Sequence, residues 1–351
     1  MDFLTDVDYG DLTVVQKKHT ILCVDGSNVL FQAAYNNDNH QSSKSSIDSI
    51  RNPLMDYENE VDTSNTDYLH HRRAIFTKFL NMINTIYKQF NCTKVYVCFD
   101  IGKSWRYFYT IGEFENHVPF TSKTYKGKRR QKMTPKEEFE YKRMLSIGKE
   151  LIEFLREKTG VLVFTKQLIE SDDFLAHIPT VEKHHDYIVM STDGDLTQLL
   201  RHPNTQVYDM YHKVLRPACD VEWFMFEKCV RGDDSDYVQS AYPRVRLTEI
   251  KKAYEDTFAQ VNFMKATWKD KLDPTIIHTV GDFFKENQLL MDLTKQPDSI
   301  IQTISDTIRD TLKTNRFVNK IEICRALNAL ELEVVGKRVM DNTFPWLHGA
   351  N

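Results

Sequence analysis

The 351-residue sequence lacks closely spaced cysteine pairs: it has six cysteines, and no two of them form a CxxC motif. They are Cys23, Cys92, Cys98, Cys219, Cys229 and Cys324. Cysteines at short, regular spacing are typical of zinc sites and of disulfide frameworks in secreted proteins. Their absence argues against a zinc site and indicates a reducing cytoplasm.

The sequence also lacks an apolar run of membrane-spanning length, which is about 20 residues. Its first residues, MDFLTDVDYGD, are acidic, whereas a signal peptide begins with basic residues and continues with apolar ones. We therefore expect no membrane partner. The 41% hydrophobic and 27% charged residues are typical of a soluble globular protein with one large core or two modest ones.

A positive net charge is lacking as well. The formal charge of −4 disfavours nucleic-acid binding, because surfaces that bind nucleic acid are cationic. This objection weakens if many carboxylates face metal ions while the positive charge is concentrated in one segment. The distribution of charge therefore matters more than the sum.

Three short apolar runs end in carboxylates, at 20–25, 94–100 and 187–193. A fourth, 161–164, leads into the ESDD sequence at 170–173. Short runs rich in Val and Ile are typical of strands buried on both faces of a parallel sheet, and helical patterns separate them. We predict an α/β fold with a mainly parallel central sheet and flanking helices. Ligands bind beyond the carboxyl ends of such strands, where these Asp residues lie.

The rest of the chain divides by composition. Residues 36–68 are polar and are interpreted as a long insertion without evident chemistry. From residue 259 the sequence is mostly helical in pattern, so we expect one region over 1–258 and a C-terminal helical region over 259–351.

Nine acidic residues are candidates for one shared site. Singly, each has an ordinary explanation as a helix N-cap, a first-turn carboxylate or a turn-closing residue. If the strands are adjacent, however, the carboxylates meet in one crevice, where their repulsion requires cations. Oxygen ligands without His or Cys select Mg²⁺ or Mn²⁺, and two such ions suffice for phosphoryl transfer. The candidates are Asp25, Asp100, Glu170, Asp172, Asp173, Asp193, Asp195, Asp233 and Asp236.

A segment after the second strand is first aromatic and then basic. Residues 105–109 read WRYFY, and residues 123–132 hold six Lys or Arg side chains. Aromatic rings among cations are what a single-stranded channel requires. Two alternatives stay open, a solvated basic loop and a core segment in which Phe108 is buried. The candidate nucleic-acid contacts are Trp105, Arg106, Tyr125, Lys128, Arg130, Lys251 and Lys252.

The order of these motifs resembles the flap endonuclease / 5′-3′ exonuclease family, and within it the ribonuclease H branch of T-even bacteriophages. The resemblance covers nearly the whole chain apart from the insertion and the tail. It rests on VDGSNVLF around Asp25, VCFD at Asp100, YKGKR at 125–129, ESDD at 170–173, STDGDLTQLL from Ser191, RGDDSD ending at Asp236, and FKENQLLMDLTKQPDSI at 284–300.

The resemblance implies roles for individual residues. Asp25, Asp100, Glu170 and Asp172 would surround one Mg²⁺, and Asp193, Asp195 and Asp236 a second. Asp173 and Asp233 would support these ligands, and Lys126 and Arg129 would clamp the scissile phosphate. The fold would be that of a PIN-like 5′-nuclease, with a catalytic domain over 1–258 and a helical arch formed by 102–145.

Two features depart from the family pattern. The stretch 237–246 has no glycine where the family has a Gly-rich turn that binds duplex backbone and a monovalent cation. Tyr237 also stands where the family usually has Asn. The helix expected over 247–257 would still present Lys251 and Lys252 to phosphates.

The function implied by the resemblance is a Mg²⁺-dependent 5′-3′ exonuclease and flap endonuclease, in the cytoplasm of a bacterial host. It would act on DNA and RNA–DNA hybrid 5′ ends and remove RNA primers during phage replication. The alternative is a non-catalytic protein that binds branched DNA. An Asp-nucleophile phosphatase is disfavoured because Ser27 stands where a second Asp is needed. The apolar peptides Phe3–Leu4 and 344–347 are either hooks for a sliding clamp or a single-strand-binding protein, or parts of the core.

Overall fold

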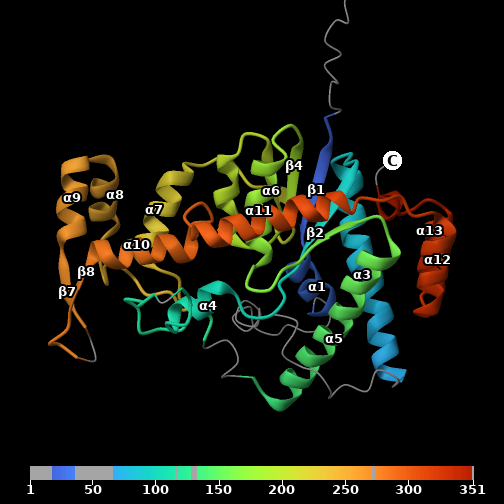
Figure 1. The fold of residues 1–351 in the computed structure, drawn as a ribbon, viewed down its shortest axis with the longest axis horizontal. Coiled ribbons are helices and arrows are strands. Elements are labelled where there is room, and N and C mark those ends of the chain that lie inside the picture. Colours follow the sequence, from blue (N-terminus) through green and yellow to red (C-terminus); the bar gives the residue numbers. More distant parts are fainter. Residues whose placement is uncertain (1–17, 36–65, 116, 128–132, 271–272, 350–351) are drawn as a thin grey trace, which may run out of the picture.

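A six-stranded sheet runs through the middle of the molecule in the computed structural model (Figure 1). The structure describes residues 18–35, 66–115, 117–127, 133–270 and 273–349. The insertion expected over 36–68 therefore lies outside the described residues, apart from its last three positions. Phe3 and Leu4 also lie outside them.

The strand order is β3-β2-β1-β4-β5-β6, and all neighbours pair in parallel except β5 and β6. The strands are β1 (Thr20–Asp25), β2 (Lys94–Cys98), β3 (Leu162–Phe164), β4 (Asp186–Ser191), β5 (Thr205–Asp209) and β6 (Val214–Leu215). Since β1 lies between β2 and β4, the three strands expected to end in carboxylates are direct neighbours. The predicted fold class, a mainly parallel central sheet with flanking helices, is confirmed.

Alternating residues of the strands supply two separate cores, because successive side chains point to opposite faces. Leu22 and Val24 of β1 belong to one cluster, whereas Ile21 and Cys23 belong to the other. All four side chains are fully buried. This burial on both faces explains why the strand sequences are continuously apolar rather than alternating.

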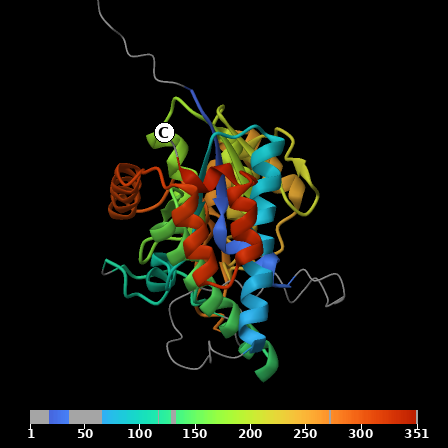
Figure 2. The ribbon, with the colours of Figure 1, turned by 90° about the vertical axis from the view of Figure 1, so that its right-hand side faces the viewer.

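Helices cover both faces of the sheet. The first core is closed by α1 (Gly26–Tyr35), α3 (Thr66–Gln89), α5 (Pro135–Lys158), α12 (Lys320–Ala329), α13 (Glu333–Met340) and the 3₁₀ turn η2 (Pro345–His348). Figure 2 shows α3 beside the two C-terminal helices on this face. The second core is closed by α4 (Trp105–Thr110), α6 (Ser171–Val181), η1 (Gly194–Arg201), α7 (Val221–Arg231), α8 (Leu247–Glu255), α10 (Val280–Met291) and α11 (Asp298–Lys313).

The region after residue 259 is mostly helical, with one exception that the sequence pattern did not predict. A two-stranded antiparallel hairpin, β7 (Thr267–Lys269) and β8 (Ile277–Thr279), follows α9 (Thr257–Lys265). In Figure 1, α8, α9 and the hairpin form the end of the molecule opposite α12 and α13. The domain boundary expected between residues 258 and 259 falls inside α9 and remains a proposal. The helices after it, α10 to α13, pack into the two cores on either face of the sheet.

The peptide at 344–347 packs on its own domain, which is the second of the two alternatives for it. Phe344, Trp346 and Leu347 are 1%, 3% and 0% exposed. The Trp346 indole also donates a hydrogen bond to Asn84 of α3, at 3.3 Å. No helix among the described residues is both long and apolar enough to cross a membrane.

We predict that Trp346→Ala lowers the free energy of unfolding by about 3–5 kcal/mol, because it leaves a large cavity beneath α3. The matched control is Val334→Ala on α13, whose side chain is 73% exposed and should change stability by less than about 0.5 kcal/mol. Denaturant unfolding followed by circular dichroism measures both. Equal stability of the two variants would contradict the packing described here.

Candidate active site

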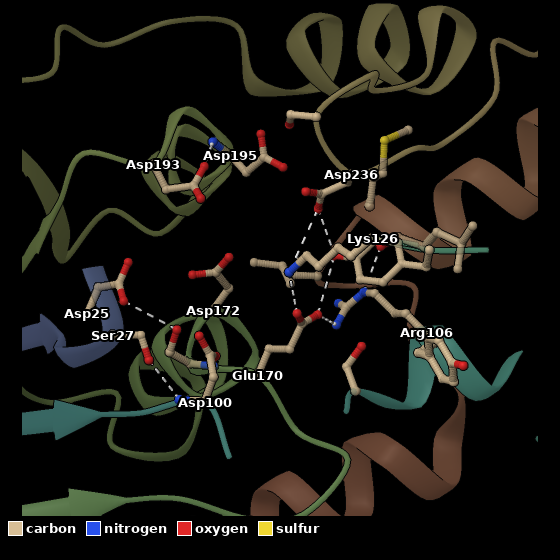
Figure 3. Close-up of a pocket in the computed structure, with 18 of the residues that line it drawn as sticks. Asp25, Ser27, Asp100, Arg106, Lys126, Glu170, Asp172, Asp193, Asp195 and Asp236 are labelled. Carbon is tan, nitrogen blue, oxygen red and sulfur yellow. Dashed lines mark hydrogen bonds and ion pairs between the residues drawn. The ribbon is translucent and has the colours of Figure 1, made fainter. Parts of the chain in front are cut away.

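A pocket of about 480 Å³ opens at the carboxyl ends of the central strands (Figure 3). Seven carboxylates line it, coming from the ends of β1, β2 and β4, the start of α6 and the turn after α7. Sequence positions more than 200 residues apart thus contribute to one wall. The seven are Asp25, Asp100, Glu170, Asp172, Asp193, Asp195 and Asp236.

Asp25 and Asp100 are held by hydrogen bonds from α1, β4 and α6. The Asp25 carboxylate accepts hydrogen bonds from the Asn28 amide at 3.1 Å and the Ser191 hydroxyl at 2.7 Å. Asp100 accepts one from the Ser171 amide at 2.6 Å. Gly26 allows this close approach of β1 and β2, since a Cβ there would lie 2.8 Å from the Cys98 carbonyl oxygen.

The start of α6 places two carboxylates in the pocket and one behind it. Glu170 is the N-cap residue, and its backbone amide donates to the Asp173 carboxylate at 3.0 Å, as in a capping box. Asp173 is fully buried, whereas Asp172 points into the pocket (Figure 3). The capping explanation therefore holds for Asp173 and Glu170, and Glu170 also lines the site.

Arg106 ties these carboxylates to two other elements. It is 3% exposed and donates to Glu170 at 2.8 Å, to Asp173 at 2.7 Å and to the Leu290 carbonyl at 2.7 Å. Burial alone would lower the pKa of Arg106, but Asp173 and Glu170 hold it well above its usual range. Arg106 therefore acts inside the protein; its burial argues against its expected role as a direct nucleic-acid contact, which stays a prediction.

The opposite side of the pocket is organised by Lys228 of α7. Its ammonium lies 2.7 Å from Asp195 and 2.6 Å from Asp233. Asp233 also accepts a hydrogen bond from the Ser235 amide at 2.8 Å and so closes the turn that carries Asp236. Asp193 caps η1 by accepting from the Asp195 amide at 2.9 Å.

Lys126 lies between the two groups of carboxylates (Figure 3). Its ammonium forms an ion pair with Glu170 and lies 3.9 Å from Asp236. Its backbone has a positive φ of 56°, and its amide donates to the Asp236 carbonyl at 2.8 Å. The preceding Tyr125 donates its hydroxyl to the Asp236 carboxylate at 2.8 Å.

Glu286 of α10 fixes the loop that leads to Lys126. Its carboxylate is 3% exposed and accepts the backbone amides of Phe120 at 2.8 Å and Thr121 at 2.9 Å. Burial raises the pKa of Glu286, although these two hydrogen bonds act in the opposite direction. The loop position therefore depends on a helix that follows it by more than 150 residues.

Burial and mutual repulsion shift the pKa values of the pocket carboxylates. Burial, with Asp193 and Asp25 nearby, raises the pKa of Asp172 well above its usual range. Burial and Asp193 raise the pKa of Asp195 to about 6 against the effect of Lys228. Burial acts to raise the pKa of Glu170, but the cations Lys126 and Arg106 outweigh it and lower this pKa.

This donor set fits a hard divalent cation, because it consists of oxygen ligands and a cation would relieve the repulsion around Asp172. With the side chains as they stand, no group of three or more Asp, Glu, His or Cys residues in the described part of the chain is arranged to hold a metal ion. Glu170 and Asp195 are instead paired with Lys126 and Lys228.

The other predicted contacts fall in three places. Trp105 is 0% exposed and packs in the second core, so its prediction as a base-stacking residue is wrong. Tyr125 is 5% exposed and lines the pocket. Lys251 and Lys252 are exposed on α8, outside the pocket-lining set. Lys128, Arg129 and Arg130 lie outside the described residues.

Three residues of the site were not predicted from the sequence. Lys228 gave no signal, because its contact with Asp195 depends on where the end of α7 packs. The other two, Lys103 and Tyr107, line the pocket, whereas Lys228 acts on it through Asp195. Lys103 precedes α4 and Tyr107 lies within it, so their proximity depends on the turn into a short helix that the sequence pattern did not predict.

Comparisons with known proteins agree on one family. A family model described as the 5′-3′ exonuclease N-terminal resolvase-like domain matches residues 20–228. Ribonuclease H of Enterobacteria phage T4 is 25% identical over 226 residues, 62% of this chain and 70% of that protein.

Two solved structures are similar in fold. A T5 protein co-crystallised with metal ions has a TM-score of 0.56 at 17% identity, over 85% of this chain and 100% of that chain. The bacteriophage T5 flap endonuclease, in a pseudo-enzyme–product complex with DNA and metal ions, has a TM-score of 0.54 at 16% identity, over 84% and 99%.

We predict that Asp172→Asn raises the melting temperature of the metal-free protein. The folded-state pKa of Asp172 lies above the unfolded value, so its ionised form destabilises the fold, increasingly as pH rises above about 4. In chelator at pH 7.5 we expect a gain of roughly 3 °C, which shrinks toward pH 5.

The control is Asp306→Asn on α11, whose side chain is 56% exposed and whose replacement should leave the melting temperature within about 1 °C. Differential scanning calorimetry in both buffers measures the two variants. An unchanged or lowered melting temperature for Asp172→Asn would show that the site is not under charge strain.

Proposed function

The chain belongs to the 5′-3′ exonuclease family, and from this premise we propose that it is a divalent-metal-dependent 5′-nuclease that hydrolyses phosphodiester bonds at 5′ ends and flaps. The observation that supports this most is the convergence of seven carboxylates in one pocket with Lys126 among them. Its substrates would be DNA duplexes and RNA–DNA hybrids. In a phage context it would remove RNA primers during replication.

Two Mg²⁺ ions, for which Mn²⁺ can substitute, would supply a water nucleophile and stabilisation of the leaving oxygen. Asp25, Asp100, Glu170 and Asp172 would hold one ion. The second would be held by Asp193, Asp195 and Asp236. The backbone and hydroxyl hydrogen bonds to Asp25, Asp100 and Asp236 fix these carboxylates before any substrate arrives.

Lys126 would contribute to the reaction by contacting the scissile phosphate. Its present partner is Glu170, which has a second cationic partner in Arg106 and so stays compensated when Lys126 turns away. A lysine next to the phosphate offsets the negative charge that develops in the transition state. Arg129 would add a second, bidentate contact.

Asp173 and Asp233 would act through their neighbours. Asp173 orients Arg106, and Asp233 orients Lys228 and the turn before Asp236. Neither residue lines the pocket. Tyr125 positions Asp236 in the same way.

Further contacts are proposed with the nucleic acid and with partner proteins. The arch over 102–145 and the phosphate contacts of Lys128, Arg130, Lys251 and Lys252 would guide the nucleic acid. Because the peptide 344–347 is buried, only Phe3–Leu4 remains a candidate hook for a sliding clamp or a single-strand-binding protein.

We predict that Asp193→Asn lowers cleavage of a 5′-flap DNA and of an RNA–DNA hybrid by more than about 100-fold, because a ligand and a charge are lost. Each substrate is labelled at either end and incubated with Mg²⁺ or with chelator. Asp306→Asn serves as the control and should cleave normally.

DNA binding by Asp193→Asn in chelator should stay within about twofold of wild type, since the removed charge repels phosphate. Wild-type cleavage that persists in chelator, or full activity of Asp193→Asn, would exclude the metal-dependent mechanism. Bound DNA without any product from the wild-type protein would favour the non-catalytic alternative.

We also predict that Lys126→Ala lowers the single-turnover rate by about 100-fold while weakening substrate binding by less than about fivefold. The control is Lys313→Ala, whose side chain is 75% exposed on α11. Rapid-quench measurements at saturating protein give the rate. A normal rate in Lys126→Ala would remove this lysine from the chemistry.

A further inference from the structure

The pocket has a wall that the proposed chemistry does not use. In Figure 3 the carboxylates of the strand ends lie on one side, and Lys126 and Arg106 lie on the other. Lys103 and Tyr107, which flank Arg106 in the sequence, also line the pocket. Further lining comes from Leu290 and Met291 at the end of α10, where the Leu290 carbonyl accepts from Arg106, and from Leu293 after it. This wall combines a cation, an aromatic ring and apolar side chains, which is the composition that contacts a base and its phosphate.

Tyr107 is the aromatic residue of this wall that remains accessible. Within the described part of the chain, the pocket has two aromatic lining residues, Tyr107 and Tyr125. Tyr125 is 5% exposed and its hydroxyl is bound to Asp236. The neighbours of Tyr107 in α4, Trp105 and Tyr109, are 0% and 4% exposed, whereas Tyr107 itself is only partly buried.

Lys103 already contacts the Tyr107 ring. Its ammonium lies 4.1 Å from the ring centroid, and Lys103 is exposed. No carboxylate in the described part of the chain forms an ion pair with Lys103. A cation–π contact at an exposed site is worth about 0.5–1 kcal/mol, and stacking of a base on an aromatic ring about 1–3 kcal/mol. Stacking of a base on Tyr107 would therefore be the stronger of the two contacts, and an ammonium displaced from the ring would be available to a phosphate.

We infer that Lys103 and Tyr107 form a nucleotide-binding subsite next to the carboxylates, in which a base stacks on Tyr107 and Lys103 binds an adjacent phosphate. The subsite rests on the proposed function, because its ligand is the nucleic acid that the carboxylates would cleave. Since both residues line the same pocket as the carboxylates, the contacted nucleotide lies close to the scissile phosphate. Stacking is insensitive to base identity, so the subsite selects the position of the strand and not its sequence.

The test measures binding of a 5′-flap DNA to the full-length protein in chelator, where no product forms. Tyr107→Ala should weaken binding by about 10-fold, and Tyr107→Phe should bind like wild type, because stacking needs the ring and not the hydroxyl. The control is Phe317→Ala, which removes an aromatic side chain that is 54% exposed and outside the pocket lining.

A set of flap substrates, each with one abasic nucleotide, then locates the contact. At one or two positions near the junction, the missing base should weaken wild-type binding by about 10-fold and leave Tyr107→Ala unaffected. When the missing base is at any other position, Tyr107→Ala should still bind about 10-fold more weakly than wild type. Such position-dependent loss cannot come from a general defect in folding.

Lys103 is tested by the salt dependence of the same binding. Lys103→Met should reduce the slope of log K against log salt by about 0.7–0.9, the value for one phosphate contact. Lys313→Met should leave the slope unchanged.

Two outcomes would overturn the subsite while leaving the proposed function intact. In the first, wild type binds and cleaves flap DNA, but Tyr107→Ala binds as tightly as wild type. In the second, Tyr107→Ala weakens the binding of every abasic substrate by the same factor, whatever the position of the missing base. A wild-type protein that neither binds nor cleaves flap DNA in Mg²⁺ would instead overturn the proposed function itself.

Discussion

Mutual repulsion among carboxylates crowded into one partly buried pocket is the constraint on which the rest of this structure depends. Parallel strands β2, β1 and β4 end at the same edge, so their terminal carboxylates cannot avoid one another. Folding without external cations requires charge from elsewhere, and the chain supplies it with Lys126, Arg106 and Lys228. These three cations approach from the loop between α4 and α5, from α4 and from α7. The site is therefore held together by electrostatic pairing between elements rather than by the sheet alone.

The three cations differ in how far their charge is committed to partners inside the protein. Arg106 is enclosed and makes contacts to α6 and to the end of α10, so its role is fixed by packing. Lys126 lines the pocket with ion pairs to Glu170 and Asp236, and Arg106 also compensates Glu170. Lys228 is shared between two carboxylates. The charge of Arg106 is thus committed to contacts inside the protein, whereas the charge of Lys126 is accessible from the pocket.

Sequence reasoning located the carboxylates well, because strand ends are recognisable from apolar runs such as 20–25 and parallel strands share one edge. It failed where the orientation of a side chain depended on a helix that had not been recognised. The sequence WRYFY offered several rings for stacking; the structure buries Trp105 and opens Tyr107, since α4 turns them to different sides. Lys228 and the β7–β8 hairpin escaped prediction because tertiary packing, and not local pattern, determines them.

The hydrogen bonds of Glu286 have a consequence for how the protein is made. The loop before Lys126 is anchored by a helix that is synthesised much later, and Arg106 likewise ends on the Leu290 carbonyl. A nascent chain on the ribosome therefore carries all seven carboxylates before the loop beside them has its anchor. Assembly of the site waits for α10, so a partly translated chain that lacks this helix has all seven carboxylates but no complete pocket around them.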